Sequence, residues 1–564
     1  MSGTVAAKAA DGSRGAAAWP ARRPPWLTPV NVVIVAATLL ALWLRVYYQY
    51  VRPGFLLGVN EYDDGPYFGG AVRLVHGALP YRDFIFVQPP GITLLMSPVG
   101  LLADWTGTAW GLAIGRLLTV AAGTASVVLG GLLVRHRGLL AVLCTCGILA
   151  IYPDAVAAAH TVLVEPWLVL FCLAGAVAVF DGDAVAASTK RLVLGGVAFG
   201  FAGAVEAWAI VPVIMVLALC LPHLRRAARF AAGVAAGFLV PVLPFVAAGP
   251  SQFYRSLIVA QIGYRAHAYR IGAWFRLRNM TGIPGAQSWA HSTVLAVALA
   301  IVAFVAAAQA TGWLATRRPP PALDWFATLS AALVVIMFLW PPQFHYHFSA
   351  FLAPFLGLSI ALAATRLVAG AERLAGGLSA KRWLWPAAAG LAAVAVVVAA
   401  VFQGTSERPD RPVIGPIPPA LVSKIPAGAC VLTDQVSLTI AANRFVSDVP
   451  GCPLMVDTLG TDLALSDGLK PATGAARVPA VTAVWREAFG RAQYVLLTRI
   501  NARRIPWSPA LTAYFDGNFA QIFQSQNRLT LYVRKGLTHL STPGALRVPK
   551  ARQAGAERPF WPEK

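Results

Sequence analysis

Long apolar runs that recur along the chain constrain its fold more than any other feature. The run from Thr108 to Val134 carries a single charged residue, Arg116. About 20 consecutive apolar residues are enough for an α-helix to cross the hydrocarbon core of a bilayer. The whole chain of 564 residues is 57% hydrophobic and 12% charged, whereas a soluble domain carries about 25% charged residues. The sequence therefore predicts a polytopic α-helical membrane protein.

The formal net charge of +22 would indicate a nucleic-acid partner in a soluble protein. In a polytopic membrane protein, arginines in short cytoplasmic loops account for such an excess, because positive charge is retained on the cytoplasmic side. We therefore expect no nucleic-acid partner and use the basic clusters to orient the spans.

This positive-inside reasoning predicts about eleven membrane passes within residues 29–402. Residues 1–28 are expected to be disordered and cytoplasmic, and residues 51–107 to form one large external loop with a surface segment over 89–104. The predicted spans cover residues 30–50, 108–134, 138–156, 164–181, a broken pair within 193–222 that turns near Trp208, 230–248, 289–313, 322–340, 348–366 and 384–402.

The region after the last span has a different, more polar composition. Apolar runs such as "ACVLTD", "QYVLLT" and "RLTLYVRK" alternate with helix-permitting segments, which predicts an extracytoplasmic α/β domain over 403–540 and a disordered tail over 541–564. Cys430 and Cys452 lie in this domain and could form a disulfide in an oxidising compartment, or remain two free thiols.

Polar residues in and near the spans collect toward the external surface. Arg45, Arg116 and Glu206 lie near the outer ends of their apolar segments, and Glu61 and Asp63 follow the first span. Ionisable groups are costly in lipid, so their depth indicates where function lies. A carboxylate there could accept the proton of an attacking hydroxyl, while cationic side chains could bind a phosphate.

The stretch "NEYDDGPYFGGAVRLVHGALPYRDF", followed by "VQPPG", resembles the first external loop of GT-C superfamily glycosyltransferases. The branch it resembles most is that of protein O-mannosyltransferases and aminoarabinose transferases, which is glycosyltransferase family 39-like. Asp63, Asp64 and Tyr67 match the acidic pair and tyrosine of that loop, and Pro89-Pro90 match its later part. "HTVLVEPWLVLF", with Glu165, looks like the second external loop, and "QFHYHFSAFLAPFLGL" is similar to the segment before a late helix. The resemblance covers roughly residues 30–402.

Two positions depart from this pattern. Gln88 stands where many relatives have a basic residue before the double proline, so phosphate binding must depend on other groups. Glu206 stands where a lysine is frequent in related chains.

The resemblance implies a role for each candidate residue. Asp63 is the candidate general base, Asp64 would orient the acceptor or a basic partner, and Glu165 would face the same site. Tyr67, Gln88 and His347 are assigned to the acceptor and loop region, and no metal or cofactor is expected. Independently of the resemblance, Arg265, Arg270 and Arg276 lie in an external basic stretch that runs against the positive-inside bias. This stretch could bind the donor phosphate or lipid headgroups, and His345 is a further candidate for the donor phosphate.

The resulting functional hypothesis is an integral membrane glycosyltransferase, either a hexosyl- or a pentosyltransferase. It would transfer a sugar from a polyprenyl-phosphate-linked donor, with inversion, to an extracytoplasmic glycolipid, cell-wall glycan or protein. The alternatives are a lipid or solute transporter or flippase, and a non-enzymatic envelope scaffold. A transporter would normally place its binding groups at the bilayer midplane, where this sequence has no charge pair.

Overall fold

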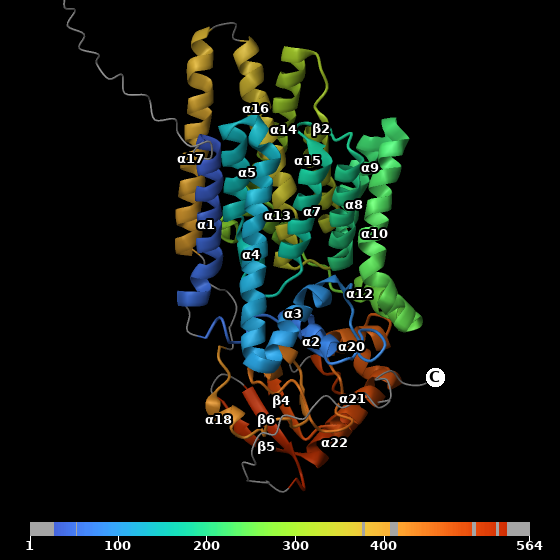
Figure 1. Ribbon diagram of the computed structural model, residues 1–564. Coiled ribbons are helices and arrows are strands. Elements are labelled where there is room, and N and C mark those ends of the chain that lie inside the picture. Colours follow the sequence, from blue (N-terminus) through green and yellow to red (C-terminus); the bar gives the residue numbers. More distant parts are fainter. Residues whose placement is uncertain are drawn as a thin grey trace, which may run out of the picture.

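A computed structural model describes residues 28–51, 54–374, 378–406, 415–498, 504–525 and 529–537 of the chain. Long helices form a bundle, and a smaller domain with a β-sheet lies against one end of it (Figure 1). The first loop, with α2 (Asp64–Val75) and α3 (Gly91–Thr106), lies between the bundle and this domain. The predicted disordered segments, 1–28 and 541–564, fall outside the described residues except for residue 28.

Within the described residues, seven helical segments are long and apolar enough to cross a membrane, and two shorter apolar helices accompany them. The fold is therefore that of a polytopic helical membrane protein, while the number of passes stays a prediction. The bundle helices are α1 (Pro29–Val51), α4 (Thr108–Val134), α5 (Leu139–Ile151), α7 (Glu165–Val179), α8 (Thr189–Val205), α9 (Ile210–Cys220), α10 (Leu224–Ala248), α14 (His291–Thr316), α15 (Ala322–Leu339), α16 (Ala353–Leu374) and α17 (Leu378–Ser406).

The predicted break near Trp208 lies at Glu206 in the structure. Helix α8 ends at Val205, and the Glu206 side chain accepts a hydrogen bond from the Ala207 backbone N–H, which starts a short 3₁₀ turn before α9. This is the capping role that a carboxylate plays at a helix start. Glu206 therefore lies in the turn between two apolar helices, where its side chain is half-buried.

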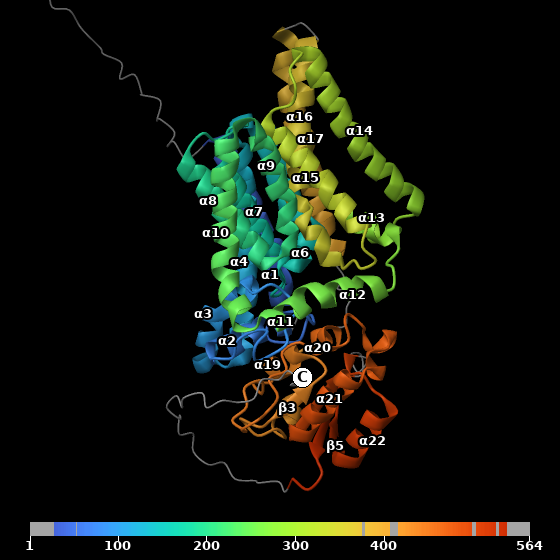
Figure 2. The same ribbon diagram turned by 90° about the vertical axis from the view of Figure 1, so that its right-hand side faces the viewer.

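The segment 249–288, which the predicted topology leaves as an external loop between two spans, is largely helical. It contains α11 (Pro250–Tyr254), a π-helical turn (Arg255–Val259), α12 (Ala260–His267) and α13 (Ala273–Met280). Helices α11 and α12 run along the junction between the bundle and the sheet domain, and α13 lies at the end of the bundle beside α14 (Figure 2). Arg265 and Arg276 are thus held on helices, whereas Arg270 lies in the segment between α12 and α13.

The C-terminal domain is built around a four-stranded sheet in the order β3-β4-β6-β5. Strand β3 (Val431–Thr433) pairs parallel with β4 (Tyr494–Thr498). Strand β6 (Leu529–Arg534) pairs antiparallel with β4 on one side and with β5 (Phe519–Gln524) on the other. Three strands lie at the apolar runs quoted above. The accompanying helices are α18 (Pro419–Val422), α19 (Val436–Ala441), α20 (Thr458–Leu465), α21 (Pro479–Arg491) and α22 (Pro509–Asn518).

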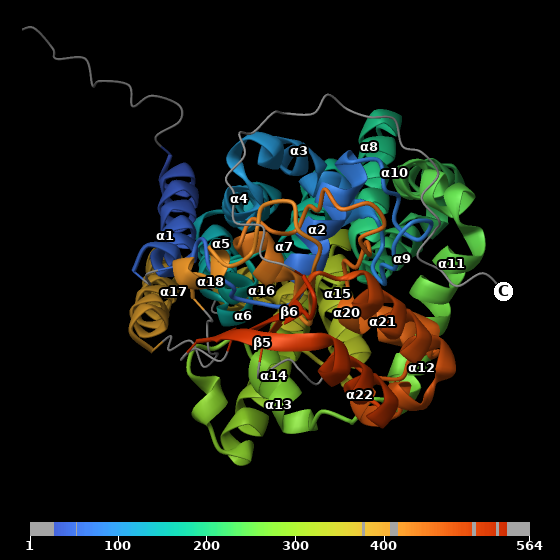
Figure 3. The same cartoon turned by 90° about the horizontal axis from the view of Figure 1, so that it is seen from below.

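This domain is packed tightly on the membrane part of the chain, across one end of the bundle (Figure 3). Val436, Ile440 and Phe445 belong to the same buried apolar cluster as residues of α2, α3 and α4. The Asn443 side chain accepts a hydrogen bond from the Ala109 N–H at 2.9 Å and so caps the start of α4. The composition of the sequence changes at residue 403, but the residues after it still pack against the helices that precede it.

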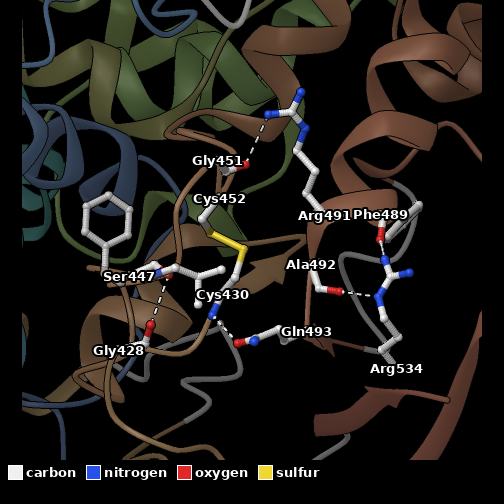
Figure 4. Close-up of a disulfide and its surroundings, with 12 residues drawn as sticks. Gly428, Cys430, Ser447, Gly451, Cys452, Phe489, Arg491, Ala492, Gln493 and Arg534 are labelled. Atoms are coloured by element: carbon white, nitrogen blue, oxygen red, sulfur yellow. Dashed lines mark hydrogen bonds between the residues drawn. A yellow bond between two sulfur atoms is a disulfide. The ribbon is translucent and has the colours of Figure 1, made fainter. Parts of the chain in front are cut away.

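The sheet domain contains the disulfide between Cys430 and Cys452, which are 22 residues apart (Figure 4). Cys430 directly precedes β3, and its N–H donates to the Gln493 side chain at 3.1 Å. The disulfide thus fixes the segment before α20 to the start of β3. Both α20 and the turn after β3 contact the first loop, so the disulfide supports the side of the domain that faces the bundle.

Candidate functional site

Asp63 lies at the start of α2, at the level where the bundle meets the C-terminal domain. Its side chain is 36% exposed. Burial and the neighbouring charge of Glu61 raise the pKa of the Asp63 carboxyl to about 7, against the opposing effects of His347 and Arg504. A carboxyl with such a pKa can accept a proton near neutral pH.

Glu165 and Asp63 are brought together by His347. The Nδ1 atom of His347 lies 2.6 Å from Glu165 Oε1, and its Nε2 atom lies 3.9 Å from Asp63 Oδ2. Glu165 is fully buried at the first turn of α7, and within the described part of the chain its Oε2 has no hydrogen-bond partner. Two carboxylates from separate loops thus meet at one imidazole.

The backbone beside Asp63 is held by the C-terminal domain. The carbonyl of Glu61 accepts hydrogen bonds from the Gln435 side chain at 2.9 Å and from the Ser437 hydroxyl at 3.1 Å. A side chain at Gly65 would meet the Ser437 backbone nitrogen at 2.5 Å, so this close approach requires glycine. The position of Asp63 therefore depends on the docking of β3 and α19.

Asp64 occupies a different environment from Asp63. It forms an ion pair with Arg116 of α4 at 2.7 Å, with both side chains fully buried, and it also accepts a hydrogen bond from Thr161 at 2.6 Å. Arg116 donates further to the carbonyls of Phe55 and Leu56. The structure thus places Asp64 with a basic partner, in a network that ties the first loop to α4.

The candidate arginines divide into two groups. Arg265 at the end of α12 is exposed, and its positive charge acts on the Glu206 carboxyl. Arg270 is also exposed, and its guanidinium lies 3.5 Å from the Leu339 carbonyl. Arg276 is 1% exposed. Its guanidinium donates to the carbonyls of Ile271, Phe338 and Pro342 at 3.0, 2.7 and 2.5 Å. Arg276 therefore ties α13 to the end of α15 and has little capacity left for a ligand.

The remaining candidates surround Asp63 at different depths. His345 is exposed and stacks on His347, with ring centroids 5.6 Å apart. Tyr67 is buried, and burial followed by the charges of Asp63 and Glu165 raises the pKa of its phenol. Gln88 is partly exposed, and its carbonyl accepts a hydrogen bond from Tyr81 at 2.5 Å. His345 and Tyr67 are thus close to Asp63 or its partners, whereas Gln88 contacts Tyr81 of the first loop.

Several residues of the C-terminal domain join this site without having been singled out in the sequence. The Tyr62 hydroxyl donates to Asp457 at 2.8 Å and accepts from the Leu459 N–H at 2.8 Å, and the Arg504 guanidinium lies 3.3 Å from the Tyr62 ring centroid. The charge of Arg504 also acts on Asp63. The signal available in the sequence was weak, since Asp457 directly precedes a helix and reads as an ordinary N-cap.

Comparison with solved structures shows what this arrangement is similar to. The crystal structure of ArnT from Cupriavidus metallidurans bound to undecaprenyl phosphate has a TM-score of 0.54 and 16% sequence identity, over 91% of this chain and 99% of that chain. The apo structure of the same protein has a TM-score of 0.52 and 16% identity, over 89% and 97%. The chain has the GT-C fold. No protein-family profile and no curated protein matches its sequence.

The described site thus combines the carboxylates of Asp63 and Glu165 with the imidazole of His347. Among the described residues, no group of three or more His, Cys, Asp or Glu side chains is arranged to hold a metal ion. The roles of Asp63, Asp64, Glu165 and the arginines stay predictions.

Proposed function

We propose that this protein is an inverting membrane glycosyltransferase that uses a polyprenyl-phosphate-linked sugar. Its acceptor would be a glycolipid, a cell-wall glycan or a protein on the extracytoplasmic side. The proposal is supported by the GT-C fold and by the similar ArnT structure, which is bound to undecaprenyl phosphate. The observation that carries it is the Asp63 carboxyl, with its raised pKa, beside the His347–Glu165 pair.

In the proposed reaction Asp63 is the general base. The acceptor oxygen forms a bond to the anomeric carbon of the sugar while its proton passes to the Asp63 carboxylate. The bond between the anomeric carbon and the phosphate oxygen breaks, and its electron pair remains on the polyprenyl phosphate. Because the acceptor attacks opposite the leaving group, the anomeric configuration inverts. His347 and Glu165 act as positioning residues in this scheme, since they contact Asp63 or its partner.

The leaving phosphate would be bound by exposed cations at the same level. Arg265 lies near Glu206, and His345 stacks on the imidazole beside Asp63. Preorganised cations of this kind stabilise charge that develops as the leaving group departs. Arg270 could contribute from the loop after α12, whereas Arg276 is assigned a structural role. Because these side chains would neutralise the phosphate, we expect transfer to persist in EDTA.

The test is sugar transfer by the purified full-length protein in nanodiscs. It would be supplied with a panel of polyprenyl-phosphate-linked hexoses and pentoses and an extract of envelope acceptors. General-base assistance contributes about 10²- to 10⁴-fold, so Asp63→Asn is expected to slow turnover by that order. The matched control is Asp516→Asn, which changes an exposed carboxylate of α22.

An equal rate for wild type and Asp63→Asn would contradict the role of Asp63. Movement of the lipid donor across a vesicle membrane without any sugar transfer would instead support the transporter or flippase alternative.

A further inference from the structure

A second polar cluster lies on the side of Asp63 that faces the C-terminal domain. Its two cations are Arg504, which follows β4, and Lys470, which follows α20. Its two aromatic residues are Tyr62 of the first loop and Tyr264 of α12. We call these four residues the Arg504 cluster. It is separate from the exposed arginines assigned above to the leaving phosphate.

Arg504 is held in place on a fixed surface. Its guanidinium lies 3.3 Å from the centroid of the Tyr62 ring, and the Tyr62 hydroxyl is itself bound to Asp457, Thr458 and the Leu459 N–H. Stacking on an aromatic face orients a guanidinium while leaving its N–H groups free to donate. The Nη1 atom of Arg504 is buried and has no hydrogen-bond partner among the residues that the structure describes.

Lys470 lies near Arg504 in a comparable environment. Its ammonium is 4.1 Å from the centroid of the Tyr264 ring. Burial and the positive charge of Arg504 lower the pKa of Lys470 to about 8. The two cations therefore repel each other at a site that is only partly open to water.

The nearby carboxylates do not neutralise these two cations directly. Asp457 binds the Tyr62 hydroxyl and the Gly460 N–H, while both oxygens of Asp434 bind Thr498. Among the described residues, no carboxylate forms an ion pair with Arg504 or Lys470 within 4.0 Å. Two neighbouring cations, one with a buried unused donor, leave a site that an anion would stabilise.

We propose that Arg504 and Lys470 bind a phosphate group of a substrate on the C-terminal-domain side of Asp63. A planar guanidinium and an ammonium together offer the donors that phosphate oxygens accept. That this phosphate belongs to a substrate rests on the proposed glycosyl transfer, whereas the binding of phosphate itself does not. The phosphate could belong to the lipid-linked donor or to an acceptor that arrives from the aqueous side.

The experiment measures phosphate binding by the purified full-length protein in nanodiscs. One probe is fluorescent undecaprenyl phosphate incorporated in the nanodisc, and the other is inorganic phosphate at constant ionic strength. The variants are Arg504→Gln, Lys470→Gln and the charge-preserving Lys470→Arg. The matched control is Arg477→Gln, which removes an exposed cation from the same domain.

A hydrogen bond to a charged group is worth roughly 10- to 100-fold in affinity, so each glutamine variant should weaken binding by about that factor. Lys470→Arg and Arg477→Gln should bind as wild type. Weakening for undecaprenyl phosphate alone would assign the subsite to the donor, and weakening for inorganic phosphate alone would assign it to the acceptor. Unchanged binding of both probes by both glutamine variants would overturn the proposal. Wild-type protein that binds phosphate at this cluster but transfers no sugar would contradict the proposed function and leave the subsite intact.

Discussion

His347 and Glu165 form a buried hydrogen bond of 2.6 Å between Nδ1 and Oε1. A carboxylate can only accept, so His347 donates its Nδ1–H to Glu165. The other ring nitrogen then faces Asp63, whose Oδ2 is 3.9 Å away. Glu165 thus fixes the orientation of the imidazole that borders the proposed base.

Replacing Glu165 with glutamine tests this positioning role. Glu165→Gln removes the negative charge that holds His347, and we expect turnover to fall by less than the 10²- to 10⁴-fold assigned to Asp63→Asn. The loss should appear in kcat rather than in KM for the donor, because Glu165 would not contact the donor. Glu372→Gln is the control, since Glu372 pairs with Trp385 on helices outside the site. A fall in donor affinity alone would contradict the positioning role.

The raised pKa of Asp63 predicts a pH profile. As a base, Asp63 works only when deprotonated, so kcat/KM should fall about tenfold per pH unit below about pH 7. Because the folded-state pKa lies above the ordinary value, protonation of Asp63 favours the fold, and this contribution is lost as pH rises through about 7. Asp63→Asn should therefore be at least as stable as wild type at pH 8. A wild-type profile that is flat between pH 5 and 8 would contradict the assignment.

The buried ion pair between Asp64 and Arg116 predicts a loss of stability rather than of chemistry. Both side chains are fully buried, and removing one partner leaves an uncompensated charge, which costs about 3–5 kcal/mol. Asp64→Asn should therefore lower the unfolding temperature in detergent, whereas the neighbouring Asp63→Asn should not. The double variant Asp64→Asn/Arg116→Met should recover part of the loss. Normal stability of Asp64→Asn with abolished turnover would instead make Asp64 a direct participant in the reaction.

Much of the helical framework could be predicted from the sequence, because a helix that crosses a bilayer needs about 20 consecutive apolar residues. Apolar length locates spans. The break near Trp208 follows because the apolar stretch over 193–222 must cross an even number of times to keep the basic residues beyond it on the cytoplasmic side. Asp63, Glu165 and His347 could be placed on one membrane face by the same reasoning, and in the structure they lie in contact. The short helices α12 and α13 were not predicted, because neither is long or periodic enough to be recognised alone.

Contacts between distant segments could not be predicted. Arg276 has the same residue type as Arg265, and only the fold shows that its guanidinium is buried against three carbonyls. Arg504 contacts Tyr62 of the first loop, although the whole membrane part of the chain lies between these two residues in the sequence. Strand β5 has glutamines at two of its six positions and pairs at the sheet edge, so its sequence carries little strand signal.

The Cys430–Cys452 disulfide predicts a measurable contribution to stability. Closing a loop of this length contributes about 3 kcal/mol in the chain-entropy description, so the double variant Cys430→Ser/Cys452→Ser should unfold at a lower temperature. Cys144→Ser, which changes a free cysteine, is the control. Mass spectrometry of protein isolated under alkylating conditions should find Cys430 and Cys452 linked. Recovery of both as alkylated thiols would contradict this prediction.

The orientation of the chain in the membrane is the prediction on which the proposed site depends. Basic residues after α4, including Arg135 and Arg137, should face the cytoplasm, and the C-terminal domain should be extracytoplasmic. Because Asp63 is held by Gln435 and Ser437 through the Glu61 carbonyl, the site must lie on the same side as that domain. Reporter fusions after residues 137 and 405 should therefore read inside and outside, respectively. The opposite pattern would place Asp63 in the cytoplasm and remove the basis for an extracytoplasmic acceptor.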